Sequence, residues 1–258
     1  MIDRLSATLI TTGLETGFIG QRVLYYPVLR TTMETARQEA LNGAPEGTVV
    51  ITGEQTAARG RLKRTWLTPQ GNLALSVVLY PARRNLHSVI MVASVAVVRT
   101  IETVTGLKPV LKWPNDVMVN NRKVCGILVE ANVQPGTVNF VVVGIGINAN
   151  LEPSDFPEIL PVATSLSREL GQKVSRLEIV RRLLCEMERL YLSSTESDAV
   201  YEEWRDRLAT LGKKIRVTSG TGTQEGIAES VDADGALLLR LPDGSLDRVL
   251  AGDVTLRE

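Results

Sequence analysis

The sequence is poor in the residues on which several kinds of chemistry depend. It has one histidine, His87, and two cysteines, Cys125 and Cys185, which are too far apart to form a C-x-x-C pair. This scarcity argues against a zinc site, a disulfide framework and a catalytic triad built on imidazole. The few cysteines fit a reducing compartment, so a cytoplasmic protein is expected.

Excess charge and long apolar runs are lacking as well. Lys plus Arg and Asp plus Glu number 29 each, so net charge does not attract the chain to nucleic acid or to an anionic membrane. The first residues, Met1 to Leu5, do not have the pattern of a signal peptide, and no uninterrupted apolar stretch approaches about 18 residues. We therefore expect neither a membrane segment nor a nucleic-acid partner.

Periodicity in the sequence predicts an α+β protein of two domains. Strands are expected at residues 23–26, 48–52, 73–80, 110–113, 116–119, 124–130 and 139–143, and helices at 32–41, 87–104, 176–191 and 199–208. Thr31 followed by Glu34 has the pattern of a capping box for the first of these helices. The spacing favours a mixed, antiparallel-rich sheet with helices packed on it over residues 1–211. Short β-type runs between glycines then predict a small barrel of about five strands over residues 212–258.

A basic loop directly follows the second expected strand. Arg59, Arg61, Lys63 and Arg64 fall within six positions, with Gly60 among them. Arginine offers a rigid fork to carboxylate or phosphate, and glycine lets backbone N–H groups approach the same anion. This loop alone is equally compatible with a solvated surface or a nucleic-acid contact.

The run Lys112-Trp113-Pro114-Asn115-Asp116 joins two expected strands. Pro114 fixes φ and removes an N–H from the ladder, and such a kink can aim Lys112 inward. That lysine is either a surface group or a buried cation that pairs with a substrate anion. Trp113 is expected in the core, and Asn115 and Asp116 are also compatible with a simple turn cap.

Glycines interrupt two later strands, in Gly126-Ile127-Leu128 and in Gly144-Ile145-Gly146-Ile147-Asn148. Glycine within a strand indicates a bulge, or space for a ligand that lies against the backbone. Neither a G-x-G-x-x-G nor a G-x-x-x-x-G-K-[ST] motif occurs, so a Rossmann site or a P-loop is not indicated.

Taken together and in this order, the motifs resemble the biotin protein ligase family over nearly the whole chain. Thr31-Thr32-Met33-Glu34 is similar to its Ser-Thr-Asn turn, Gln55 with Arg59-Gly60-Arg61 to its Gly-Arg-Gly-Arg loop, and Lys112 to Asp116 to its Lys-Trp-Pro-Asn-Asp motif. Lys123 to Glu130 and Gly144 to Asn148 resemble its two glycine-bearing strands, and residues 213–258 its SH3-like domain. Departures are Met33 for asparagine, Ala58 for glycine, and Leu62-Lys63 for Arg-Gly.

The resemblance implies the class II synthetase-like catalytic fold and an ATP-dependent reaction with Mg²⁺. Biotin becomes biotinyl-5′-AMP and is then transferred to a lysine of a biotin carboxyl carrier protein, without an enzyme nucleophile. The implied catalytic residues are Lys112, Arg59 and Arg61. The implied biotin-binding residues are Thr31, Thr32, Met33, Gln55, Arg59, Gly60, Arg61, Lys112, Gly126 and Ile127. The implied adenylate-binding residues are Arg61, Arg64, Trp66, Asn115, Asp116, Lys123 and Asn148, with no metal held by the protein itself.

Two rival functions remain at this stage. A lipoate or octanoate ligase or transferase shares the ligand class, but the Arg-Arg-x-x-Gly-Gly-Gly signature is absent. A nucleic-acid-binding module would use the basic loop, although aromatic residues make up only 4% of the chain and offer few stacking platforms. Few residues precede Val23, so we expect a ligase without the DNA-binding domain of some relatives. A homodimer is left open, because a sheet edge can pair with a carrier or with a second copy.

Overall fold

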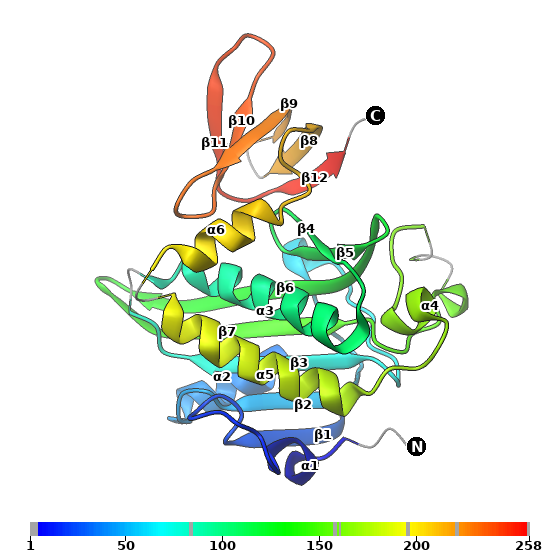
Figure 1. Ribbon diagram of the computed structural model, residues 1–258. Helices are drawn as coiled ribbons and strands as arrows, with labels where there is room; N and C mark the ends of the chain where they lie inside the picture. The colour runs from blue at the N-terminus through cyan, green and yellow to red at the C-terminus, as the bar shows by residue number, and fades with distance from the viewer. Residues whose placement is uncertain are drawn as a thin grey trace.

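The computed structural model describes residues 5–82, 85–156, 159, 161–194, 197–219 and 222–256. Met1 to Arg4, part of the N-terminal stretch considered above as a signal peptide, therefore lie outside the described residues. The chain forms two sheets with helices on the larger one (Figure 1). The larger sheet has the order β1 (Val23–Leu29), β2 (Val49–Gln55), β3 (Leu73–Leu79), β7 (Thr137–Ile147), β6 (Arg122–Gln134), β5 (Asp116–Val119) and β4 (Val110–Lys112).

Among the described strands of this sheet, only β1 and β2 pair in parallel, which confirms the expected antiparallel-rich mixed sheet. β6 and β7 are longer than predicted, because their polar ends at Gln134 and Thr137 continue as a hairpin beyond the buried core. Pattern-based reasoning ends a strand where hydrophobic alternation stops, whereas the hydrogen-bonded ladder continues past that point.

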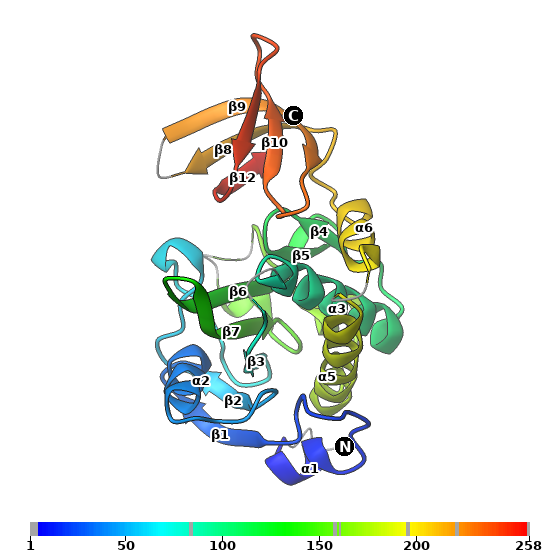
Figure 2. The ribbon, with the colours of Figure 1, turned by 90° about the vertical axis from the view of Figure 1, so that its left-hand side faces the viewer.

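Helices cover both faces of this sheet. α2 (Thr32–Leu41) lies on one face, and α3 (Ser88–Thr105) and α5 (Arg176–Ser193) lie on the other, as Figure 2 shows. α6 (Ala199–Asp206) contacts α3, and the short helix α1 (Ala7–Thr11) contacts α5. α1 and the other short helix, α4 (Leu166–Leu170), were not predicted, because helices this short carry little periodicity.

α3 is the centre of the core. Most of its side chains are buried, and it ends at Gly106, whose φ of 72° is the left-handed conformation that favours glycine. Among the described residues it is the one helix long and apolar enough to cross a membrane, but it lies between the sheet and the helices α5 and α6. α3 is therefore a core helix.

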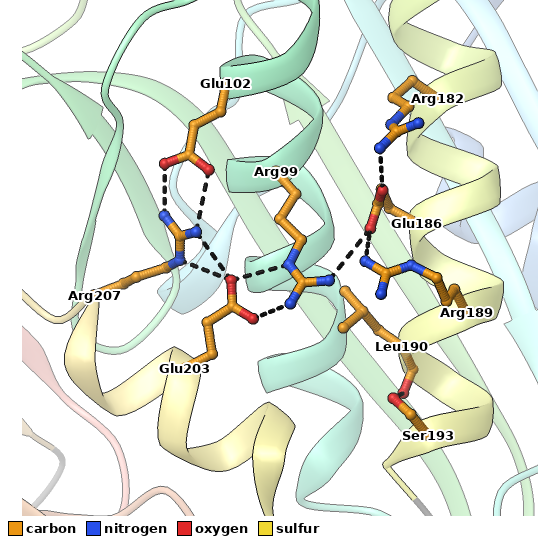
Figure 3. Close-up of polar contacts among 9 residues, drawn as sticks. All are labelled: Arg99, Glu102, Arg182, Glu186, Arg189, Leu190, Ser193, Glu203 and Arg207. Carbon is orange, nitrogen blue, oxygen red and sulfur yellow. Dashed lines mark hydrogen bonds and ion pairs between the residues drawn. The ribbon is translucent and has the colours of Figure 1, made fainter.

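Ion pairs join the three helices of this face (Figure 3). Arg99 on α3 donates through Nε to Glu203 Oε1 on α6 at 2.9 Å, and its Nη1 lies 3.6 Å from Glu186 Oε2 on α5. Arg207 donates through Nη1 to Glu102 Oε1 on α3 at 2.7 Å. These contacts fix α6, the last helix before the second sheet, against α3.

The second sheet is antiparallel, with the order β11 (Leu246–Val249), β10 (Leu237–Arg240), β9 (Gly222–Val231), β8 (Lys214–Ser219) and β12 (Asp253–Leu256). Its five strands are the number expected for this part of the chain. The expected boundary at 211/212 falls in the connection between α6 and β8. Trp113, buried as predicted, joins the two sheets by donating from Nε1 to the Gly235 carbonyl at 2.9 Å.

Candidate active site

Every residue to which the resemblance assigns a catalytic or binding role lines one cavity of about 540 Å³, a volume usual for a small-ligand site. These residues are Thr31, Thr32, Met33, Gln55, Arg59, Gly60, Arg61, Arg64, Trp66, Lys112, Asn115, Asp116, Lys123, Gly126, Ile127 and Asn148. They come from six segments of the chain, which lie before, within and after the basic loop in the sequence. The structure therefore brings the complete predicted set together.

Strand register explains why residues so distant in sequence meet. Lys112 pairs with Asp116, Asp116 with Gly126, Gly126 with Gly146, and Gly146 with Ala74. Directly paired residues point to the same face of a sheet, so these residues form one row across five neighbouring strands. Lys112 stands at one end of the row, and the glycines Gly126 and Gly146 stand in its middle.

The glycines in the sheet make room for two side chains. A Cβ at Gly146 would lie 2.4 Å from Trp66 Nε1, and a Cβ at Gly144 would lie 2.4 Å from Met33 Sδ. Both glycines stand in regular register with β6, so the expected bulge is not found there. The Trp66 indole and the Met33 thioether occupy part of the space beside the strand backbone, while Gly126, Gly144 and Gly146 also line the cavity.

The turn before α2 differs from the capping box that was predicted. Thr31 is the N-cap residue, but its side chain makes no capping hydrogen bond. Glu34 lies toward Arg30 instead, with 3.7 Å between its Oε2 and the Arg30 Nε. The backbone N–H of Thr32, one of the first helix N–H groups that have no partner within the helix, donates to Gln55 Oε1 of β2 at 2.8 Å.

The cavity is rich in cations, and they differ in how they are paired. Within the described part of the chain, Lys112 is half-buried and its ammonium has neither a hydrogen bond nor an ion pair. Arg59 is exposed at the rim. Arg61 donates to Asn115 Oδ1 at 3.0 Å, and burial lowers the pKa of its guanidinium against the opposing influence of Asp253 and Asp116. Lys112 is thus the half-buried cation that an incoming anion can approach without displacing a partner.

The remaining polar residues of the set are held by neighbours. Lys123 Nζ lies 2.5 Å from Asp116 Oδ1 and 5.2 Å from the centre of the Trp66 ring. Asn115 donates from Nδ2 to the Ile127 carbonyl at 2.8 Å, and Asn148 donates from Nδ2 to the Thr164 carbonyl at 3.0 Å. These contacts orient the side chains before any ligand binds.

The basic loop has defined backbone structure and contacts, unlike the freely solvated surface loop that was one of the two alternatives. Arg61–Lys63 form a 3₁₀ turn, in which Leu62 has a left-handed backbone with φ 52° and a side chain that is 64% exposed. Ala58 is buried, and its carbonyl accepts from the Trp66 N–H at 3.1 Å. Arg64 forms an ion pair with Asp253 of β12. The second sheet therefore contacts the loop directly.

Sequence reasoning missed several residues of the cavity. Asp253, Val254 and Thr255 of β12 line it, and no motif pointed to them. The proline-bearing segment 151–162 contributes Ile159, Pro161 and Val162. Its residues 157, 158 and 160 lie outside the described residues.

Comparison with known proteins identifies the family. Residues 25–148 match the model of the biotin/lipoate A/B protein ligase family, and residues 210–257 match that of the biotin protein ligase C-terminal domain. The bifunctional ligase/repressor BirA of Bacillus subtilis (strain 168) is 36% identical, in an alignment that covers 98% of this chain and 79% of that protein. The chain belongs to the biotin protein ligase family.

Other relatives agree with this membership. The biotin--[acetyl-CoA-carboxylase] ligase of Paracoccus denitrificans is 35% identical over 82% of this chain and 92% of its own length. A solved biotin protein ligase from Aquifex aeolicus, in complex with biotin and ATP, superposes with a TM-score of 0.77 at 28% identity and covers 92% of this chain and 99% of its own. The expected family and fold are therefore confirmed.

Proposed function

We propose that this biotin protein ligase uses the cavity to join biotin to AMP and then to transfer the biotinyl group to a carrier lysine. The observation that carries the assignment to this cavity is the unpaired Lys112 ammonium at one end of the cross-strand row, with an amide-recognising set of side chains, Thr32 and Gln55, in the same cavity. A cation at one end and neutral polar groups elsewhere suit a ligand that has a carboxylate tail and a polar, uncharged head.

In the first step, a carboxylate oxygen of biotin attacks the α-phosphorus of ATP, and pyrophosphate leaves with the electrons of the broken P–O bond. Lys112, with Arg59 or Arg61, neutralises the two anions as they approach each other. In the second step, the amine of the carrier lysine attacks the acyl carbon of the mixed anhydride, AMP leaves, and an amide bond forms. The enzyme accelerates both steps by positioning the reactants and by stabilising charge, and no enzyme nucleophile is required.

The biotin site in this proposal comprises the turn at Thr31–Met33, Gln55, the loop residues Arg59 to Arg61, Lys112, and the β6 pair Gly126 and Ile127. The adenylate site comprises Arg61, Arg64, Trp66, Asn115, Asp116, Lys123 and Asn148. Their common presence in one cavity supports both assignments. The segment that follows Asn150 and the basic loop are proposed to close over the adenylate and to exclude water from the anhydride.

We propose that Mg²⁺ is carried by the phosphates of ATP. The described residues that line the cavity include two carboxylates, Asp116 and Asp253, and both already pair with cations, Lys123 and Arg64. Across the described part of the chain, no group of three or more His, Cys, Asp or Glu side chains is placed to hold a metal. The residues present thus do not form a dedicated metal site, and we assign no step to one.

The proposed acceptor is a lysine of a biotin carboxyl carrier domain in the cytoplasm, and nucleic acid is not a proposed partner. β1 stands at an edge of the larger sheet and pairs only with β2 among the described strands. An exposed strand edge can add the strand of another chain. A carrier domain or a second ligase copy is the proposed occupant of this edge.

ATP–pyrophosphate exchange with biotin, lipoate or octanoate offered separately tests the function. We expect exchange with biotin and little with the other two acids. Exchange with lipoate or octanoate but not with biotin would reject the proposal in favour of the lipoate-type alternative.

A further inference from the structure

Four polar side chains of the cavity region form one hydrogen-bonded chain. Ser76 Oγ lies 2.8 Å from Thr32 Oγ1, Thr32 Oγ1 lies 3.3 Å from Gln55 Oε1, and Gln55 Nε2 lies 3.0 Å from Thr68 Oγ1. Ser76, Thr32 and Thr68 are all buried. Ser76 pairs with Gly144 across β3 and β7, so it stands directly beneath the turn that begins α2. Neither Ser76 nor Thr68 lies in the motifs named in the sequence analysis.

The direction of this chain follows from the donors. The backbone N–H of Thr32 can only donate, and it lies 2.8 Å from the same Gln55 atom, so that atom is the amide oxygen. The amide nitrogen of Gln55 therefore faces Thr68. The single hydrogen of the Thr32 hydroxyl is directed to the Gln55 oxygen, and the hydrogen between Ser76 and Thr32 must come from Ser76.

This direction determines what the cavity offers to a ligand. Gln55 Oε1 accepts from the backbone N–H and the hydroxyl of Thr32. Gln55 Nε2 donates one N–H to Thr68, and its second N–H is left to donate to a ligand. Thr32 Oγ1 has one lone pair beyond the one that Ser76 uses. A donor next to an acceptor complements the carbonyl and the N–H of one amide or urea edge. An alkyl chain or a dithiolane ring complements neither.

We propose that Ser76 and Thr68 are positioning residues, which fix the direction of the Thr32 hydroxyl and the Gln55 amide and so select an acid with a cyclic urea head. This inference rests on the proposed function. Without the Ser76 donor, the Thr32 hydroxyl can rotate and present its hydrogen in place of the lone pair. A site built on fixed hydrogen bonds discriminates strongly, because an unsuitable ligand leaves buried polar groups unpaired.

The test compares four variants of the full-length protein by biotin-dependent ATP–pyrophosphate exchange and by calorimetric titration with biotin. Ser76→Ala should raise the KM and the Kd for biotin about tenfold, the usual effect of one lost buried hydrogen bond, with the KM for ATP unchanged. Its preference for biotin over lipoate should fall by the same factor. Thr68→Val should act in the same direction, whereas Thr68→Ser keeps the hydroxyl and should keep the wild-type KM.

Ser94→Ala is the matched control, because Ser94 is a buried serine of α3 whose hydroxyl donates to the Ile90 carbonyl at 2.7 Å, away from the cavity. It should leave the KM for biotin unchanged. An unchanged biotin KM in Ser76→Ala, or equal damage by Thr68→Ser and Thr68→Val, would overturn the inference. If Ser76→Ala does not fold, the inference is tested by comparing the biotin KM of Thr68→Val with that of Thr68→Ser. Wild-type protein without biotin-dependent exchange would instead reject the proposed function itself.

Discussion

At the scale of single residues, Lys112 is the half-buried cavity cation that has no partner within the described part of the chain, whereas Arg59 is exposed and the other cations are paired. Lys123 is paired with Asp116, Arg64 with Asp253, and Arg61 with the Asn115 amide. A half-buried cation without a protein partner is partly desolvated, and pairing with a ligand anion offsets that cost. This environment supports the proposed role of Lys112 beside the reacting carboxylate and phosphate.

Lys112→Ala should therefore reduce the rate of biotinyl-adenylate formation by a factor on the order of 10² to 10³, by analogy with the loss of one preorganised charge-stabilising donor. The control is Lys108→Ala, which removes an exposed lysine from the connection that precedes β4. Single-turnover measurements with both variants, with circular dichroism to verify folding, provide the comparison. Wild-type turnover in Lys112→Ala would remove Lys112 from its proposed role.

The sequence identified those site residues that occur in recognisable motifs, such as Lys112 and the arginines of the loop. It did not identify Ser76, Thr68 or Asp253, because their importance depends on which residue stands opposite them. Ser76 is an ordinary small residue in a β-type run until the register places it beside Gly144 and beneath Thr32. Long-range partners are not encoded in local patterns.

At the scale of elements, the glycines of β6 and β7 determine how the loop that carries Trp66 meets the sheet. The indole lies against Gly146, and a Cβ at Gly126 would be 3.1 Å from its Cζ3. The neighbouring Gly144 instead accommodates Met33, whose unbranched side chain adapts to new space more easily than an indole does.

The two glycines of β7 should therefore differ in their response to substitution. Gly146→Ala forces the rigid indole away from the sheet and should weaken both biotin and ATP binding about tenfold or more, with a changed tryptophan emission. Gly144→Ala meets a flexible thioether and should have a clearly smaller effect. Equal effects of the two substitutions on binding would contradict the packing of the Trp66 indole against Gly146.

The ion pairs among α3, α5 and α6 make a second element-scale prediction. Burial opposes ionisation of Glu203, but hydrogen bonds and charges from Arg99 and Arg207 outweigh it, so the pKa of Glu203 is lowered from the usual 4.5. A lowered folded-state pKa stabilises the protein above the unfolded-state value, and this contribution is lost as the pH falls through the folded-state value.

Glu203→Gln should lower the free energy of unfolding by about 1–2 kcal/mol near neutral pH, an amount reduced by partial solvent exposure. The difference from wild type should shrink below the ordinary carboxyl pKa of 4.5. Urea unfolding over this pH range measures it, with the exposed neighbour Glu202→Gln as a control. A difference that does not depend on pH would contradict an ionic origin.

At the scale of the whole molecule, the second sheet contributes β12 to the wall of the cavity. Trp113 connects it to the larger sheet through Gly235, and β12 carries Asp253 to the basic loop, where it pairs with Arg64. The Arg64 side chain is largely exposed, so this ion pair adds little to stability. Its effect is instead to restrict a long, flexible side chain near the proposed adenylate site.

Asp253→Ala should therefore raise the KM for ATP about threefold to tenfold, because ordering a free arginine on binding costs conformational entropy. The thermal unfolding midpoint and the Kd for biotin should change little. Exchange kinetics with varied ATP, calorimetry with biotin and a melting curve distinguish these effects. An unchanged KM for ATP would mean that β12 merely borders the cavity.

The most direct measurement of the central claim follows one biotin molecule through both half-reactions. The protein is incubated with biotin and MgATP, the bound small molecule is identified by mass spectrometry, and a biotin carboxyl carrier domain is then added without further ATP. We predict bound biotinyl-5′-AMP, its disappearance on addition of the carrier, and one biotin amide on the carrier lysine, with no transfer when that lysine is replaced by arginine. Absence of the adenylate, or a biotinyl group found covalently on the ligase itself before the carrier is added, would contradict this account.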